Sequence, residues 1–143
     1  MFTSDRDQQR RFYCEVWKKH RDGAVLEPLE CQLRDIILAH PEYQSLLENP
    51  DTALGKDYLP ELGETNPFLH MALHLALYEQ LATDRPAGIR AIAQQLRLRY
   101  PDPHALEHYM MDCLAEIIWQ SQRNTAPPDE AAYLRCLRRA LTA

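Results

Sequence analysis

The sequence predicts an all-α fold, a single domain over residues 1–143 arranged as an irregular bundle of five or six helices. Apolar residues recur at steps of three and four along most of the chain, and no run alternates with a period of two over a useful length. Ten prolines and only four glycines indicate sharp stops between helices rather than flexible linkers. A chain of 143 residues is also long enough to form one domain with a hydrophobic core.

The first part of the chain predicts two long helices. The first is expected over Asp5–Lys19, with Ser4 as its cap and Gly23 as the stop after its C-terminus. The second is expected over 28–39, because it opens on a proline. Proline suits the first turn of a helix, where its missing N–H costs nothing.

A helical turn, a loop and four more helices are expected after the second helix. The turn is expected over residues 40–47. An irregular loop is expected over 50–65, because prolines and glycines there interrupt any helical period. Asn66 and Pro67 then mark a strong helix start, and Asp129 is the expected cap of the last helix. The four helices are expected over approximately 66–82, 87–99, 104–123 and 130–141.

Composition and charge argue against two classes of partner. The net charge of −5 argues against broad binding to nucleic acid, which needs clustered excess lysine and arginine. Five arginines could make a local contact, although solvated surface arginine is the simpler interpretation: Arg97, Arg99, Arg135, Arg138 and Arg139. Residues 1–12 contain no apolar signal core, and no apolar run is long enough to cross a bilayer. The sequence therefore predicts a cytoplasmic protein without a membrane partner.

The cysteines are predicted to be packing residues of a reduced protein. They are far apart and form no C-x-x-C pair, the signature of zinc ribbons and thioredoxin-like motifs: Cys14, Cys31, Cys113 and Cys136. Cys113 falls on the apolar face of its helix and is expected to be inert. Nucleophilic catalysis has little support, because the chain has no G-x-S-x-G motif and no glycine-rich phosphate loop.

The stretch NPFLHMALHLALYEQ, residues 66–80, places two histidines in an otherwise apolar run. On a helix His70 and His74 lie on the same side, at the spacing that lets two imidazoles bind one metal ion. A helix that is apolar nearly all round is usually buried, and a buried polar group needs a partner. The alternative is therefore that both are core histidines, hydrogen-bonded to backbone or carboxylate groups.

A second polar stripe lies in HALEHYMMDCLAEIIWQSQRN, residues 104–124. It has a polar residue at every fourth position: His104, His108, Asp112, Glu116 and Gln120. A polar stripe on an amphipathic helix usually faces water. Trp119 projects from the same side, and a large aromatic residue favours a lined cleft over a wet surface.

If this helix packs against the histidine helix, the two stripes could form a metal site with ligands from facing helices. The predicted metal ligands are His70, His74, His108 and Asp112. Glu116 is the predicted catalytic base for a metal-activated water. The ligand set suits a divalent transition metal such as zinc, iron or manganese. His40 is either a further imidazole of this site or a favourable charge at a helix C-terminus.

The second hypothesis is a non-enzymatic interaction or structural module. In that case the cluster of histidines and acids is a hydrogen-bond network that fixes the register of the helices. The function would then lie in a surface that binds a partner, either an exposed apolar patch or the interface of a homodimer. The sequence itself identifies neither a substrate nor a partner.

The chain resembles the bacterial family called domain of unknown function 1841. The resemblance covers nearly the whole chain and is carried by SDRDQQRRF (4–12), HPEY (40–43), GETNPFLHMALHLALYEQL (63–81), DRPAGIR (84–90) and HYMMDCLAEIIWQSQRN (108–124). It implies a small soluble bacterial protein and brings no established activity. The resemblance also implies a glutamate at position 112, so Asp112 is a shorter carboxylate there. That difference weakens the case for a strict geometric role of Asp112.

Overall fold

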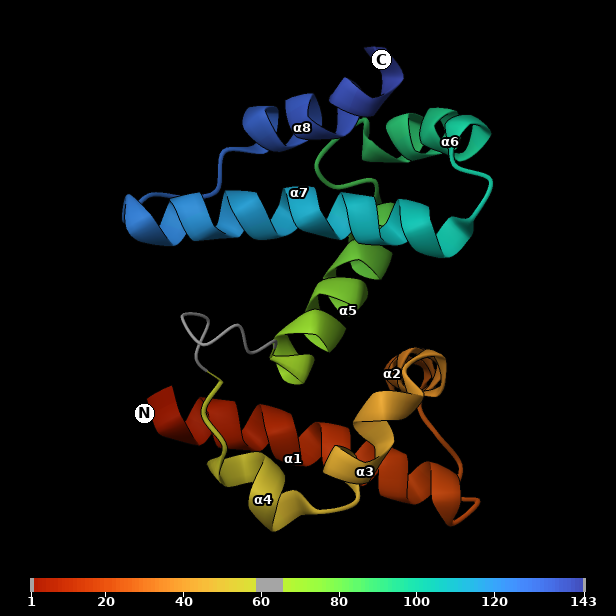
Figure 1. The fold of residues 1–143 in the computed structure, drawn as a ribbon, viewed down its shortest axis with the longest axis vertical. Coiled ribbons are helices and arrows are strands. Elements are labelled where there is room, and N and C mark those ends of the chain that lie inside the picture. The colour runs from red at the N-terminus through yellow and green to blue at the C-terminus, as the bar shows by residue number, and fades with distance from the viewer. Residues whose placement is uncertain (1, 59–65, 143) are drawn as a thin grey trace. The chain divides into compact units, whose positions relative to one another are not determined.

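The structure, a computed structural model, describes residues 2–58 and 66–142, which contain eight α-helices, one 3₁₀ helix and no strand. In chain order (Figure 1) they are α1 (Phe2–Arg21), α2 (Pro28–Ala39), the 3₁₀ helix η1 (Pro41–Tyr43), α3 (Gln44–Leu47), α4 (Pro50–Gly55), α5 (Pro67–Thr83), α6 (Ile89–Arg99), α7 (Pro103–Arg123) and α8 (Glu130–Thr142). The all-α class is confirmed. The expected number of five or six helices is wrong.

The additional helices are short ones in the first half of the chain. The expected turn over 40–47 is η1 followed directly by α3, and the expected loop over 50–65 begins with α4. These elements are three, four and six residues long. A helix of this length completes too few turns to show a 3.6-residue period, so the pattern of apolar residues could not reveal it.

Several helix ends lie where turn and cap residues predict them. Gly23 follows α1 with φ of +73°, a left-handed conformation that favours glycine. The side chain of Asn66 accepts two backbone N–H groups from the first turn of α5, at 3.0 and 3.2 Å. Asp129 accepts one from the first turn of α8 at 3.0 Å. Ser4 lies inside α1, so its predicted role as a cap is wrong.

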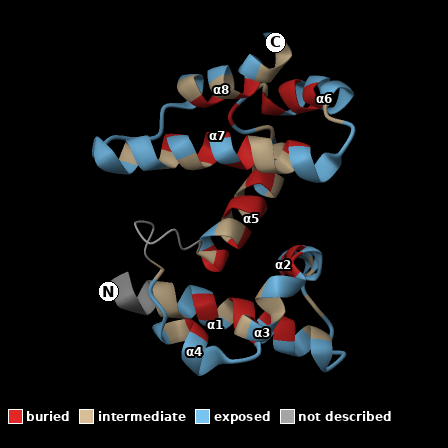
Figure 2. Cartoon of the chain, in the orientation of Figure 1, coloured by how far each residue is buried: buried red, intermediate tan, exposed pale blue. Residues whose placement is uncertain are grey.

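The chain forms two compact units, unit 1 (Met1–Ala72) and unit 2 (Leu73–Ala143). The boundary falls within the continuous helix α5, so this helix contributes residues to both units. Buried residues occur in both units (Figure 2). That residues 1–143 behave as one domain stays a prediction.

Unit 1 is organised around α1, which packs against α2, α3 and α4. The indole N–H of Trp17 donates to Glu48 at 3.2 Å and thereby links α1 to the residue that follows α3. The buried apolar residues of this unit are Tyr13, Cys14, Val16, Trp17, Leu33, Ile36, Ile37, Leu47, Ala53, Phe68 and Met71. The last two come from α5, so the start of that helix belongs to the core of unit 1.

Arg10 is a buried cation that links α1 to the end of α4. Its Nη1 donates to the carbonyl oxygens of Ala53 and Lys56 at 2.8 and 2.7 Å, and its guanidinium lies 4.7 Å from the ring centroid of Phe68. The last carbonyls of any helix have no partner within that helix. Arg10 supplies donors for the C-terminal end of α4, and this explains how so short a helix is held in place.

We expect Arg10→Met to lower the free energy of unfolding by about 2–3 kcal/mol, because two carbonyl oxygens would lose a charged donor. The measurement is urea unfolding followed by circular dichroism. Arg11→Met is the matched control, since Arg11 is the exposed neighbour on the same helix and a surface substitution changes stability by only about 0.5 kcal/mol. Equal losses in the two variants would contradict a structural role for Arg10.

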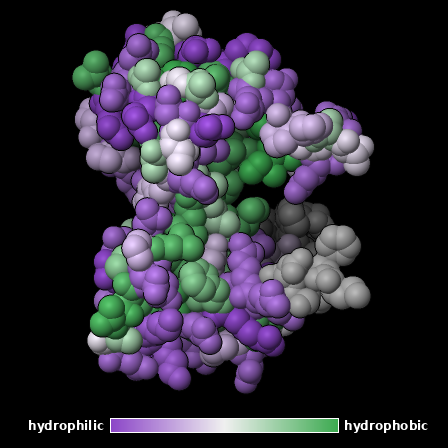
Figure 3. Space-filling model, turned by 180° about the vertical axis from the view of Figure 1, so that it is seen from behind, coloured by the Kyte–Doolittle hydropathy of each residue, from purple (hydrophilic) through white to green (hydrophobic). Residues whose placement is uncertain are grey.

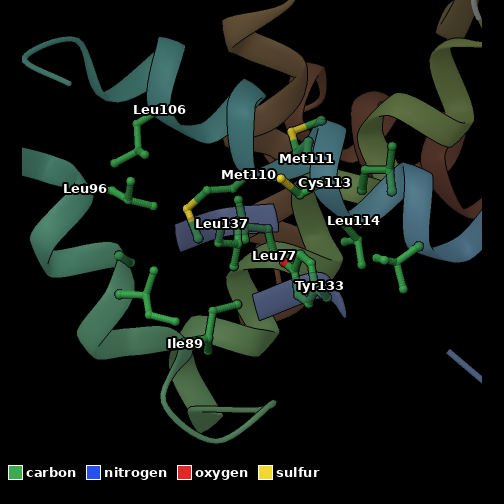
Figure 4. Close-up of a cluster of buried hydrophobic side chains, with 14 residues drawn as sticks. Leu77, Ile89, Leu96, Leu106, Met110, Met111, Cys113, Leu114, Tyr133 and Leu137 are labelled. Carbon is green, nitrogen blue, oxygen red and sulfur yellow. The ribbon is translucent and has the colours of Figure 1, made fainter. Parts of the chain in front are cut away.

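The core of unit 2 is formed by side chains from α5, α6, α7 and α8 (Figure 4). Leu77 of α5, Leu96 of α6 and Leu137 of α8 are almost completely buried. The cluster consists of Leu73, Leu77, Ile89, Ile92, Ala93, Leu96, Leu106, Met110, Met111, Cys113, Leu114, Ile117, Tyr133 and Leu137. Unit 2 therefore buries a continuous apolar core of its own.

Cys113 of α7 and Cys136 of α8 form a disulfide, with their Cα atoms 5.8 Å apart. The prediction that all four cysteines are reduced packing residues is therefore wrong for this pair, and Cys113 is not simply an inert thiol. Cys14 and Cys31 are free thiols. Sequence spacing could not reveal the bond, because α7 and α8 pack together and bring residues 23 positions apart within bonding distance.

No helix among the described residues has the length and apolar character needed to cross a membrane. The face of the protein in Figure 3 carries mostly hydrophilic residues, with hydrophobic ones gathered in smaller areas. The expected lack of a membrane partner stays a prediction. The cytoplasmic location stays a prediction.

Candidate metal centre

Helix α5 positions both histidines of the H-x-x-x-H spacing. Phe68 anchors its first turn in the core of unit 1, and Leu77 anchors a later turn in the core of unit 2. Between them, His70 is half-buried and His74 is only 2% exposed. Because α5 is one continuous helix, the two imidazoles project from the same side, about one turn apart.

In unit 1, His40 and His70 form a close imidazole pair. His40 is buried directly after α2, and its ring stacks on Tyr43 with centroids 5.1 Å apart. Its Nδ1 lies 2.7 Å from the carbonyl oxygen of Ile36. A carbonyl oxygen can only accept a hydrogen bond, so Nδ1 of His40 carries the proton. In neutral His40 the lone pair is then on Nε2, which lies 3.2 Å from Nε2 of His70.

In unit 2, His74 is held in a corresponding way by a carboxylate. Its Nδ1 donates to Oε1 of Glu107 at 2.6 Å, so the lone pair of neutral His74 is also on Nε2. The ring centroid of His108 lies 5.5 Å from that of His74. His104, one turn earlier on α7, lies 4.1 Å from His108 by the same measure.

The charge of Glu107 is stabilised by its neighbours. Burial raises the pKa of this carboxyl group, but hydrogen bonds from His74 and Tyr78 and the charges of His74 and His104 outweigh burial. The net result is a pKa of Glu107 below its ordinary value. Glu107 is therefore an anion at neutral pH and fixes both the orientation and the proton position of His74.

His40 and His74 thus share one arrangement, with Nδ1 bonded to an oxygen acceptor and the lone pair on Nε2. Metal-binding histidines are usually held in this way, by a backbone carbonyl or a carboxylate. Tetrahedral zinc with Zn–N bonds of about 2.0–2.1 Å keeps its ligand nitrogens about 3.3 Å apart. The distance of 3.2 Å between His40 and His70 is close to that value. It equally fits a hydrogen bond from His70 to His40.

The sequence matches one protein family along almost its whole length. The model of the family described as a domain of unknown function (DUF1841) matches residues 5–139. The chain belongs to the DUF1841 family. No curated protein and no solved structure matched it. The resemblance found in the sequence is thereby confirmed.

Three of the four predicted ligands of the DUF1841 chain lie in imidazole pairs. His74 and His108 are neighbours in unit 2. His70 is paired in unit 1 with His40, the residue for which the sequence left two interpretations open. His40 does end a helix, but its ring is buried between Tyr43 and His70 and bonded to a backbone carbonyl. These contacts favour the interpretation of His40 as a further imidazole, beside His70, over that of a charge at a helix C-terminus.

The two carboxylates of the second stripe lie elsewhere. Asp112 and Glu116 are exposed on α7, and Glu116 accepts a hydrogen bond from Gln120 at 2.9 Å. Trp119 is 51% exposed, so the expectation that it lines a cleft is wrong. After His108 the polar stripe therefore lies on the solvent-exposed side of α7. Polar stripes of amphipathic helices commonly face solvent.

Glu107 is the residue that sequence analysis of the DUF1841 chain missed. It precedes His108 and follows His104 by three positions, so on a helix it adjoins His104 and lies beside His108. Glu107 falls outside the strict four-residue step of the polar stripe, so that step could not identify it. A buried histidine needs a hydrogen-bond acceptor. Glu107 is the carboxylate of this helix that lies closest to its apolar face, and this position could have identified it as the acceptor.

Proposed function

We propose that this DUF1841 protein binds a divalent transition metal through the imidazoles of His40, His70, His74 and His108. The observation that carries the proposal is the arrangement shared by His40 and His74. In each, an oxygen acceptor keeps the proton on Nδ1 and makes Nε2 the donor atom for an ion. Each of them is accompanied by a second imidazole within its own unit.

Helix α5 is the scaffold of the proposed centre. It carries His70, the partner of His40, and His74, the partner of His108. Two imidazoles four residues apart on a helix can bind the same ion. An ion bound by the α5 pair would then recruit the two accompanying imidazoles as its further ligands.

The donor set favours some metals over others. Imidazole nitrogen suits zinc and iron, whereas manganese prefers oxygen ligands, so zinc or iron is favoured over manganese. Four protein ligands leave tetrahedral zinc without an open position, which is typical of structural sites. The proposed role of the metal is therefore to restrain α5 together with the residues that pair with its histidines.

A hydrolytic centre would need more than the histidines provide. It requires a water in place of one imidazole and a base to accept a proton from that water. Glu107 is already bonded to His74, and Glu116 is exposed. The catalytic role of Glu116 and the ligand role of Asp112 stay predictions, and the proposal does not depend on them.

A second candidate function comes from the same distance of 3.2 Å. If His70 donates to His40, the histidines form a hydrogen-bond network and the protein is an interaction or structural module without metal. Bacterial origin and a homodimer are predictions that accompany either candidate.

The deciding experiment is metal content by plasma mass spectrometry on untagged protein purified without chelator. We expect about one zinc or iron ion per chain, as a four-ligand site predicts, and none in the double variant His70→Ala/His74→Ala. His20→Gln is the control, because His20 packs against Trp17 in α1 and is outside the cluster. Protein that stays free of metal after incubation with zinc and with iron would overturn the proposal in favour of the network.

A further inference from the structure

Unit 2 contains a cavity of about 410 Å³. It is bordered by the helices α5, α6 and α7 and by the turn that joins α6 to α7. Its apolar walls include Leu77 and Leu81 from α5 and Leu106 and Met110 from α7. Cavities that bind small molecules have volumes of about 300–1,000 Å³ and are mostly apolar, with a few polar groups that fix the orientation of the ligand. This cavity has both properties.

The charged groups that line the cavity are Arg97 of α6 and Glu107 of α7. Glu107 accepts hydrogen bonds from His74 and Tyr78, so its carboxylate already has partners within the protein. Arg97 is exposed, and no other described residue forms a hydrogen bond or ion pair with its guanidinium. The cavity therefore offers one uncommitted cation at a position that water can reach.

We propose that this cavity binds a small monocarboxylic acid with an apolar tail. The tail packs against the leucines and Met110, and the carboxylate pairs with Arg97. A guanidinium presents parallel N–H donors that match the two oxygens of a carboxylate. The ligand carries a single negative charge, because the lining has only one cationic side chain and so offers no partner for a second carboxylate.

The volume sets the size of the acid. A water molecule occupies about 30 Å³ in the liquid, so the cavity holds roughly fourteen waters or a ligand with about as many non-hydrogen atoms. Decanoate, with twelve, is a suitable probe. Binding of the acid requires no metal, so this inference stands or falls separately from the metal proposal.

The test is a titration of the 143-residue chain, labelled with ¹³C on its methionine methyl groups, with decanoate below its micelle-forming concentration. We expect the Met110 methyl signal to shift with saturable binding. Met71 and Met111 are internal references, because both are buried in the protein but neither lines the cavity. 1-Decanol and decylamine are the uncharged and cationic probes of equal length.

Two arginine variants test the recognition of the acid. We expect Arg97→Gln to weaken decanoate binding about fivefold, the effect of one exposed ion pair, and to leave 1-decanol binding unchanged. Arg138→Gln is the control, because it removes the same charge from an exposed residue of unit 2 that does not line the cavity. Circular dichroism of both variants confirms that they are folded before they are titrated.

Three results would overturn the proposal. One is the absence of a saturable Met110 shift with decanoate. Another is equal binding of decanoate, 1-decanol and decylamine, which would show that the cavity binds apolar tails without recognising the carboxylate. The third is equal weakening by Arg97→Gln and Arg138→Gln, which would show attraction by the overall charge alone.

Discussion

Leu77→Ala is expected to lower the free energy of unfolding by about 2–5 kcal/mol, the usual loss when a buried leucine is replaced by alanine and a cavity remains. Leu77 is 1% exposed and lies in the core of unit 2. Leu69→Ala is the matched control on the same helix, because Leu69 is 55% exposed. We expect that control to change stability by less than about 0.5 kcal/mol in the same urea unfolding experiment.

The same variant tests whether residues 1–143 unfold as one domain. The boundary between the units lies inside α5, and helices form cooperatively, so loss of the unit 2 half of α5 should weaken its unit 1 half. Trp17 reports on unit 1, and a Trp119→Phe background leaves Trp17 as the only tryptophan. We expect Leu77→Ala to shift Trp17 fluorescence and the circular dichroism signal to the same lower midpoint. An unchanged Trp17 midpoint would mean two independent domains.

Glu107→Gln is expected to weaken zinc binding about 10- to 100-fold, the usual effect of removing the outer partner of a metal-binding histidine. The variant keeps the shape of the side chain but removes the charge that holds the proton of His74 on Nδ1. Competition with a chromophoric chelator measures the affinity. Glu116→Gln is the control, since it makes the same change at an exposed position of α7. Equal affinities of the native protein and Glu107→Gln would contradict the role of Glu107.

Acid unfolding of the metal-free protein gives a second readout of the same variant. The pKa of Glu107 is lower in the folded protein than in the unfolded chain, where a glutamate titrates at about pH 4.3. Its contribution to stability is therefore present above that pH and is lost as the pH falls through the lowered folded-state pKa. We expect the difference in stability between the native protein and Glu107→Gln to shrink below about pH 4. A difference that grows on acidification would show that the sign is wrong.

Local signals in the sequence were sufficient for the long helices. Asn66, Gly23 and Asp129 act through backbone hydrogen bonds or φ within a few residues, so their effects can be predicted without knowledge of packing. The short helices η1, α3 and α4 depend on contacts from elsewhere, as the bond from Arg10 to the end of α4 shows. Such contacts join residues more than forty positions apart, and periodicity contains no information about them.

The candidate site was predictable only along single helices. The spacing of His70 and His74 identified α5, because a shared face follows from helix geometry alone. The partners of these histidines depend on how other helices are rotated against α5 within each unit. That rotation turns Glu107 toward His74 and leaves Asp112 and Glu116 in solvent. The same reasoning explains the unexpected bond between Cys113 and Cys136.

The disulfide has a consequence for the integrity of the chain. The turn over 124–129 between α7 and α8 is exposed throughout, and exposed turns rich in small and polar residues are common sites of proteolytic cleavage. This turn lies inside the covalent loop that Cys113 and Cys136 close. A protease that cuts there would produce two peptides that remain one molecule, with α8 still attached to α7. The cut would release α8 only under reducing conditions. The redox state of the surroundings therefore decides whether cleavage at this turn removes α8 from the protein.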